Sequence, residues 1–195
     1  MAMKVRERRV RLNMRGNLAQ RLAFALFLCA GVVCAAAQPP AVRQPLDAIY
    51  LPTPQEVVTA MLRMARVGPG DVVYDLGSGD GRIPIAAVKE FGAARGVGID
   101  LDEARTVEAR ENARRAGVDK RVTFITQSLY DADLRPATVV TLYMGSLVNM
   151  KMRPNLRSQL KPGSRVVSHA FDMGDWTADA TITIDGRPVF LWTIR

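Results

Sequence analysis

One stretch, residues 72–82 (VVYDLGSGDGR), limits what this chain can fold into more than any other. A short β-branched run reaches the acid Asp75, three glycines follow at alternate positions, and from Ile83 the apolar residues recur at helical spacing. The pattern predicts a strand, a tight turn and a helix. Glycines in such a turn permit positive φ and bring bare backbone to a ligand, while the following helix offers unpaired N–H groups. The turn therefore predicts a site for a nucleotide-like ligand.

Two classes of ligand compete for this turn. A dinucleotide fingerprint, G-x-G-x-x-G, would place its third glycine at position 82, where the chain has Arg82, so the spacing disfavours a nicotinamide or flavin site. Asp75 and Asp80 also add two carboxylates, which suit a ligand with an ammonium and a sulfonium better than a pyrophosphate. A Gly-rich turn that binds no ligand is the structural alternative.

The motif D-L-G-S-G-D-G at residues 75–81 resembles motif I of the class I, seven-stranded S-adenosylmethionine-dependent methyltransferases. The resemblance implies a single Rossmann-like α/β domain with a doubly wound, mostly parallel, seven-stranded sheet, and S-adenosyl-L-methionine as cofactor. The motif residues expected to contact the cofactor are Asp75, Gly77, Ser78, Gly79, Asp80 and Gly81.

Two later strand ends complete the expected cofactor site. Asp100 ends a short strand 23 residues beyond Gly77, where a carboxylate can accept both hydroxyls of a ribose, and Leu101 follows it. Asp100 could instead cap the next helix, but Asp102 can take that role and leave Asp100 free. Ser128 follows a third predicted strand, at residues 121–126. Many family members carry an acid near this place to bind the adenine amino group, and Ser128 would accept that bond more weakly.

The residues just before the first strand carry a second feature of the resemblance, Y-x-P-T-P at residues 50–54. Thr53 is predicted to be the N-cap of a helix that has Pro54 at its first position and Glu56 completing a capping box. The resemblance implies another role, in which Tyr50 and Thr53 overhang the cofactor cleft. Both interpretations stay open.

The sequence defines the binding site of the methyl acceptor less closely than it defines the cofactor site. A β run at residues 137–144 predicts the central strand, whose carboxyl end is where a transferred methyl would sit. Tyr143, His169 and Asp172 are the candidates to align an acceptor or take its proton, although a lone histidine is more often a structural hydrogen-bonding group. The catalytic residues therefore remain unknown from sequence. The chain has a single histidine, and both of its cysteines lie in the leader at residues 1–37. No metal site is therefore predicted.

The net charge of +8 suggests nucleic-acid binding until the charges are located. Residues 1–37 hold seven bases and one acid, which leaves +2 on residues 38–195, so we expect no nucleic-acid partner. The apolar run at 22–37 ends in A-x-A and predicts a signal peptide cleaved after Ala37, or a membrane anchor. A Pro-rich linker at 38–49 and a methyltransferase domain at 50–195 follow.

The leader predicts a protein that is exported, to the periplasm or outside the cell, or anchored in the membrane through residues 22–37. Because S-adenosylmethionine is made in the cytosol, a location on the cytoplasmic face is the alternative.

Two alternating runs joined by Asp185-Gly186 predict a closing antiparallel hairpin, which is the layout of the same family. Taken with the apolar leader, Y-x-P-T-P and D-L-G-S-G-D-G-R, the chain resembles small bacterial relatives of mitochondrial protein-lysine methyltransferases. This narrower resemblance implies methyl transfer to a lysine amine of a protein. The alternatives are a methyltransferase for a small molecule and a cofactor-binding sensor or scaffold without turnover.

Overall fold

The computed structural model describes residues 51–195. The predicted signal peptide or anchor at 1–37, the linker at 38–49 and the cofactor contact of Tyr50 all lie outside the described residues, so they stay predictions. Within residues 51–195, no helix has both the length and the apolar character needed to cross a bilayer. This part of the chain also contains no group of three metal-ligating side chains placed to share an ion.

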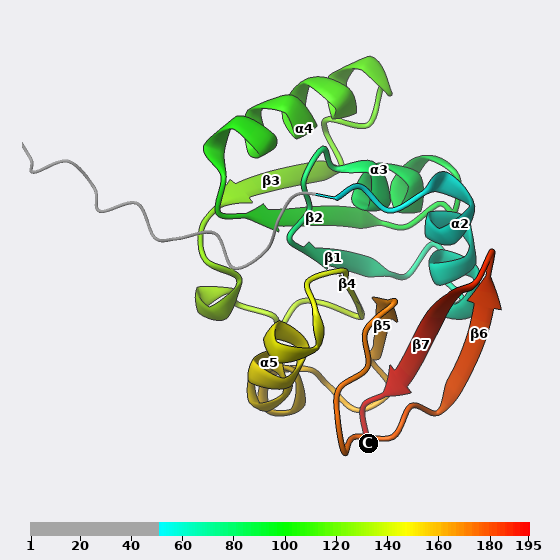
Figure 1. The fold of residues 1–195 in the computed structure, drawn as a ribbon. Helices are drawn as coiled ribbons and strands as arrows, with labels where there is room; N and C mark the ends of the chain where they lie inside the picture. Colours follow the sequence, from blue (N-terminus) through cyan, green and yellow to red (C-terminus); the bar gives the residue numbers. More distant parts are fainter. Residues whose placement is uncertain (1–50) are drawn as a thin grey trace, which may run out of the picture. The chain divides into compact units, whose positions relative to one another are not determined.

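A seven-stranded sheet forms the centre of the domain, in the order β3-β2-β1-β4-β5-β7-β6 (Figure 1). Five strands are parallel, while β7 runs antiparallel to β5 and β6 antiparallel to β7. The strands are β1 (Val72–Leu76), β2 (Arg95–Asp100), β3 (Val122–Thr126), β4 (Val139–Leu142), β5 (Arg165–His169), β6 (Ala180–Ile184) and β7 (Arg187–Thr193). The predicted doubly wound sheet with its C-terminal hairpin is confirmed.

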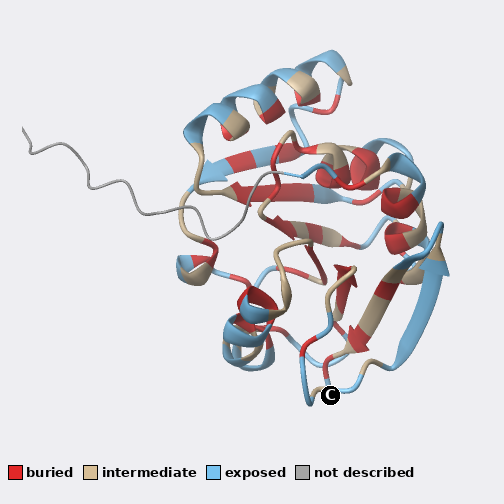
Figure 2. Cartoon of the chain, in the orientation of Figure 1, coloured by how far each residue is buried: buried red, intermediate tan, exposed pale blue. Residues whose placement is uncertain are grey.

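Helices cover both faces of the sheet, because neighbouring strand residues point to opposite sides. Val139 and Val167 belong to a core cluster with α2 (Gln55–Met64), α3 (Arg82–Lys89) and α4 (Glu103–Arg115). Their neighbours Val140 and Val166 belong to a second cluster with the short helix η1 (Leu129–Asp131) and α5 (Ser146–Gln159). All four residues of β4 are buried, as expected for a central strand (Figure 2).

The capping prediction for α2 is wrong. The helix begins at Gln55, Pro54 occupies the N-cap position, and no side chain of the described residues caps it. The Thr53 hydroxyl is instead 3.3 Å from Nδ1 of His169, which is far away in the sequence. A tertiary hydrogen bond has taken the group that would have capped the helix.

A network of hydrogen bonds fastens the amino-terminal ends of three strands. Asp71 Oδ2 accepts the backbone N–H of Gly68 at 2.9 Å, and Oδ1 accepts the Thr138 hydroxyl at 2.7 Å. The Arg165 guanidinium donates to the same Oδ1. Asp71 is 8% exposed, so its carboxylate lies largely out of water. The network joins β1, β4 and β5 at their amino-terminal ends.

Candidate functional site

A cleft opens at the carboxyl ends of β1, β2 and β4, where the strand order reverses between β1 and β4. This is the point at which open α/β sheets bind ligands. The cleft has a volume of about 960 Å³ including its open mouth. Its lining consists of Leu51, Pro52, Thr53, Asp75, Gly77, Ser78, Gly79, Asp80, Arg82, Ile83, Ile99, Asp100, Leu101, Asp102, Arg105, Ser128, Leu129, Tyr143 and Met144.

The glycine turn after β1 forms the floor of the cleft. The N–H groups of Gly77 and Ser78 both donate to the carbonyl of Ile99, at 2.8 and 3.0 Å, which joins the turn to β2. Gly77 has φ +79°, and a Cβ at this position would lie 2.1 Å from Sδ of Met144. The positive φ favours glycine at this position, and a larger residue would also require the Met144 side chain to move.

Gly81 has a different place from the one predicted. Gly81 does not line the cleft. A Cβ at this position would lie 2.4 Å from the Phe124 ring and 2.9 Å from Cβ of Ala109. The third glycine of the motif therefore lets α3 approach β3 and α4 closely. It serves the packing beneath the site.

Asp100 stands at the end of β2 with both carboxylate oxygens engaged. Oδ2 accepts the N–H of Gly79 at 2.8 Å, and Oδ1 accepts the N–H of Asp102 at 2.9 Å. Asp102 caps α4, as predicted, by accepting the N–H of Ala104. The expectation that this cap would leave Asp100 free is wrong, because two backbone donors hold its carboxylate. Each oxygen still has acceptor capacity, since a carboxylate offers about four lone-pair sites.

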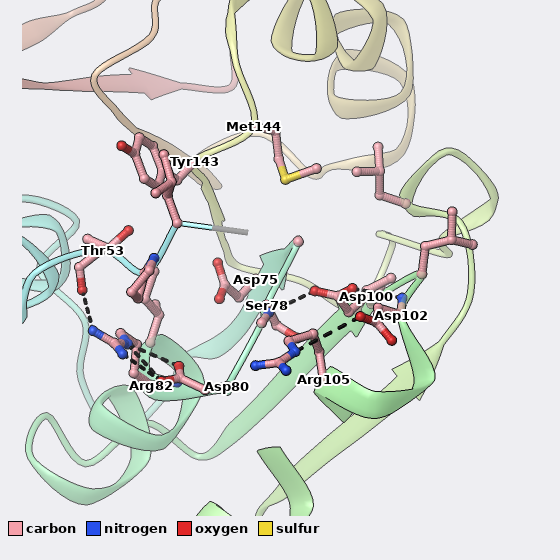
Figure 3. A pocket seen from close by; sticks show the side chains of 18 of the residues that line it. Thr53, Asp75, Ser78, Asp80, Arg82, Asp100, Asp102, Arg105, Tyr143 and Met144 are labelled. Atoms are coloured by element: carbon pink, nitrogen blue, oxygen red, sulfur yellow. Dashed lines mark hydrogen bonds and ion pairs between the residues drawn. The ribbon is translucent and has the colours of Figure 1, made fainter. Parts of the chain in front are cut away.

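Asp75 lies in the middle of the cleft and is 3% exposed (Figure 3). Burial, with smaller contributions from the charges of Asp100 and Asp80, raises the pKa of its carboxyl group to about 7, although a hydrogen bond from Thr141 opposes the shift. That bond joins Thr141 Oγ1 to Asp75 Oδ1 at 2.6 Å. A positively charged ligand would favour the ionised form of this carboxyl.

Asp80 and Arg82 form an ion pair inside the cleft. Arg82 Nη2 lies 2.6 Å from Asp80 Oδ2, and Nε is 3.0 Å from Oδ1. A second guanidinium nitrogen, Nη1, donates to the carbonyl of Thr53 at 2.9 Å. The sequence argument expected the Asp80 carboxylate to suit a cationic ligand, and in the structure this carboxylate is paired with Arg82. Sequence reasoning also missed Arg82 as a member of the site.

The three acceptor-side candidates occupy different places. Tyr143 lines the cleft, whereas His169 and Asp172 do not. His169 is 1% exposed and stacks behind Tyr143, with ring centroids 4.0 Å apart. Burial, helped by the positive charge of Arg187, lowers its pKa. Asp172 is exposed and accepts the N–H of Gly174 in its own loop.

Ser128 and Leu101 line the side of the cleft expected for adenine. Ser128 accepts the N–H of Tyr130 at 3.3 Å and so caps η1. Sequence analysis did not predict several other lining residues, for which strand and helix ends were the only signal. They are Leu51, Pro52, Arg82, Ile83, Ile99, Asp102, Arg105, Leu129 and Met144.

Comparison with known proteins gives consistent matches. A sequence profile described as the ANTKMT methyltransferase domain matches residues 75–180. A protein-lysine N-methyltransferase of Saccharolobus islandicus is 40% identical over 149 residues, covering 74% of this chain and 92% of the relative. The adenine nucleotide translocase lysine N-methyltransferase of Mus musculus is 33% identical, covering 70% of this chain. The chain spans only 59% of that mouse relative's length.

One similar solved structure is that of a methyltransferase named for a different methyl acceptor, RNA. The crystal structure of an RNA methyltransferase from Salinibacter ruber, in complex with S-adenosyl-L-homocysteine, is similar with a TM-score of 0.72 and 53% identity. The match covers 74% of this chain and 94% of the Salinibacter chain. The bound product of that complex is what S-adenosylmethionine becomes when it has given up its methyl group.

Proposed function

The chain belongs to the family of the ANTKMT methyltransferase domain and is an S-adenosylmethionine-dependent methyltransferase, and from this we propose that it methylates the side-chain amine of a lysine in a protein. The single observation that carries the proposal is the Saccharolobus protein-lysine methyltransferase, of which this chain covers 92% at 40% identity. The mouse relative that also matches is a lysine methyltransferase as well.

The residues around the cleft fit S-adenosylmethionine. We place the ribose hydroxyls at the fixed Asp100 carboxylate, and the methionine part over the backbone of Gly77 and Gly79. The buried Asp75 carboxyl suits the cationic end of the cofactor, and adenine falls beside Leu101 and Ser128. The Ser78 hydroxyl is buried and has no hydrogen-bond partner within residues 51–195, so a polar group of the cofactor would complete it.

The cofactor supplies a methyl group that is already activated by a sulfonium, so the chain needs little acid–base chemistry. Its residues have to align the acceptor with the methyl group and keep water out. Tyr143 is the acceptor-side candidate that reaches the cleft. His169 stacks on Tyr143 outside the cleft lining, and Asp172 lies in an exposed loop and does not line the cleft, so we assign no proton transfer to either.

The affinity for S-adenosylmethionine is expected to rise with pH through about 7. The pKa of Asp75 is about 7 in the free protein, and a cationic ligand stabilises the carboxylate, so binding below that pH has to expel a proton. We expect the affinity to fall by up to about tenfold per pH unit below 7. Calorimetry at pH 6 and pH 8 measures this, and Asp75→Asn should remove the dependence. Equal affinity of the wild-type protein at both values would contradict the assignment.

The same carboxyl affects the stability of the cofactor-free protein in the opposite sense. Its folded-state pKa is raised, so its contribution to stability is fully present below the ordinary value of 3.8 and is lost as the pH rises through about 7. Added cofactor should therefore stabilise the protein more at pH 8 than at pH 6.

Protein and RNA acceptors are separated by one labelling experiment. S-adenosylmethionine with a radiolabelled methyl group is incubated with the full-length protein and a cell extract, and S-adenosyl-L-homocysteine serves as the inhibitor control. We expect a label that protease releases, that nuclease does not, and that hydrolysis recovers as methyl-lysine. A nuclease-sensitive label would favour an RNA acceptor, as in the Salinibacter neighbour, and a label in the low-molecular-weight fraction would indicate a small-molecule acceptor.

The charge pattern of the described domain favours the protein acceptor. In α4 the arginines alternate with acids, and Arg105 and Arg114 pair with Glu108 and Glu111. Residues 51–195 carry a net charge of only +2. Proteins that bind RNA through its phosphates ordinarily present a strongly basic surface.

A further inference from the structure

Thr53 is held from two sides at the rim of the cleft. Its carbonyl accepts a hydrogen bond from Arg82 at 2.9 Å, and its hydroxyl is hydrogen-bonded to Nδ1 of His169 at 3.3 Å. Arg82 belongs to the start of α3, directly after the glycine turn, and His169 is the last residue of β5. Thr53 is 4% exposed, so its bond to His169 is shielded from water, while its bond to Arg82 is partly buried. A short segment before α2 thus connects the cofactor turn to a distant strand.

The imidazole of His169, to which Thr53 is hydrogen-bonded, belongs to a stack of three aromatic rings. Tyr143 stacks on His169 with centroids 4.0 Å apart, and on Phe171 with centroids 5.7 Å apart. In Figure 3, Thr53 and Tyr143 lie on one side of the cavity, opposite Asp100 and Asp102. On the side away from the ribose carboxylate, Tyr143 lines the cleft, and the rings of His169 and Phe171 stack on it outside the lining. We call these three rings the aromatic wall.

The backbone of this wall is strained and held in place. Ala170, between His169 and Phe171, has φ +64°, and the N–H of Phe171 donates back to the carbonyl of His169 at 2.8 Å. A non-glycine residue in this region is strained and persists only where its surroundings hold it. Asn149 of α5 supplies such support, since its Nδ2 lies 3.1 Å from the carbonyl of Phe171 and 2.9 Å from Ser168 Oγ.

We propose that Thr53 and His169 are positioning residues, which fix Tyr143 for the acceptor amine and connect it to the cofactor turn through the contacts Asp80–Arg82–Thr53–His169. The role assigned to the amine rests on the proposed lysine methylation, whereas the connection to the cofactor does not. His169 acts through the ring of Tyr143 and touches neither reactant. Its other nitrogen, Nε2, is buried with no partner in residues 51–195, so the Thr53 bond is the one that orients the imidazole.

Nuclear magnetic resonance tests the connection without any acceptor. His169 is the only histidine of the chain, so ¹⁵N-histidine labelling of an untagged protein gives the signals of one imidazole. We expect Thr53→Val to shift the Nδ1 resonance. We also expect S-adenosyl-L-homocysteine to shift it in the wild-type protein, and the response to be lost in Thr53→Val. Unchanged Nδ1 signals in the variant, or no response to the product in the wild type, would overturn the proposal.

Kinetics tests the positioning. Thr53→Val and His169→Phe both remove the hydrogen bond, and the phenylalanine keeps a ring against Tyr143. Each should lower kcat about fivefold to tenfold, the effect of one lost hydrogen bond, while the affinity for S-adenosyl-L-homocysteine changes less than about threefold. The double variant should lose little more than either single variant. Thr53→Ser, which retains the hydroxyl, should recover most of the lost rate.

Thr138→Val is the matched control. It removes another shielded threonine hydroxyl, at the opposite ends of the strands, where Thr138 bonds Asp71 and the N–H of Val72. It should lower the melting temperature and leave kcat unchanged. An unchanged kcat in Thr53→Val would refute the positioning role. If the wild-type protein transfers no methyl group to lysine, the proposed function fails, and the imidazole signals still decide the connection.

Discussion

Asp100→Ala is expected to weaken the binding of S-adenosylmethionine by about 10-fold to 150-fold, which corresponds to about 1.5 to 3 kcal/mol. Two losses add in this variant. The ribose hydroxyls lose a charged acceptor, and the N–H groups of Gly79 and Asp102 lose the carboxylate that orients the turn. Calorimetry on the purified protein measures the change.

Two further variants interpret the result. Asp100→Asn keeps the shape of the side chain and one acceptor oxygen, so it should lose less affinity than Asp100→Ala. Asp119→Ala removes an exposed acid between α4 and β3 and controls for the change in net charge. If Asp100→Ala bound the cofactor as tightly as Asp119→Ala does, the ribose would have to lie elsewhere.

Asp71→Ala is expected to have the largest effect on stability. It leaves the Arg165 guanidinium without its carboxylate and leaves the Thr138 hydroxyl and the Gly68 N–H without their acceptor. Breaking a buried ion pair from one side costs about 3 to 5 kcal/mol. For a domain of this size, a loss of about 3 kcal/mol lowers the melting temperature by roughly 6 to 12 °C. Thermal unfolding followed by circular dichroism measures it.

The double variant Asp71→Ala/Arg165→Met separates the ion pair from its desolvation. It removes both charges, so it should be more stable than Asp71→Ala alone. Both variants should bind S-adenosylmethionine normally at a temperature where they are folded, because Asp71 lies at the ends of the strands away from the cleft. A double variant no more stable than the single one would show that the stranded arginine is not the main cost.

Local sequence signals were sufficient for several turns and for one helix cap, whereas the seven-stranded sheet was predicted from the family resemblance. The turn at residues 77–81 and the hairpin at Asp185-Gly186 require positive φ, and the structure has positive φ at Gly77, Asp185 and Gly186. Asp102 was predicted as a cap from its neighbours alone, and a cap is formed within a few residues. Such features depend on contacts between residues close in sequence, which a single chain displays directly.

The errors concern partners that are far apart in sequence. Thr53 had the surroundings of an N-cap, but its hydroxyl bonds His169, 116 residues away. The motif spacing identified Arg82 only as a residue that is not glycine, yet its guanidinium joins Asp80 to Thr53. No periodicity or propensity reports which distant side chain a polar group will meet, because the tertiary fold decides it.

The strand order also has a consequence for how the chain folds during synthesis. β6 precedes β7 in the chain but joins the sheet only through it, so it has no partner until β7 has been made. Its five residues, Ala180–Ile184, carry no charge, and most of the strand is exposed even in the finished sheet. Until β7 docks on β5, the nascent chain therefore presents two open strand edges, at β5 and at β6. Uncharged edges of this kind pair readily with other chains, so an undocked β7 leaves these strands open to pairing with another molecule.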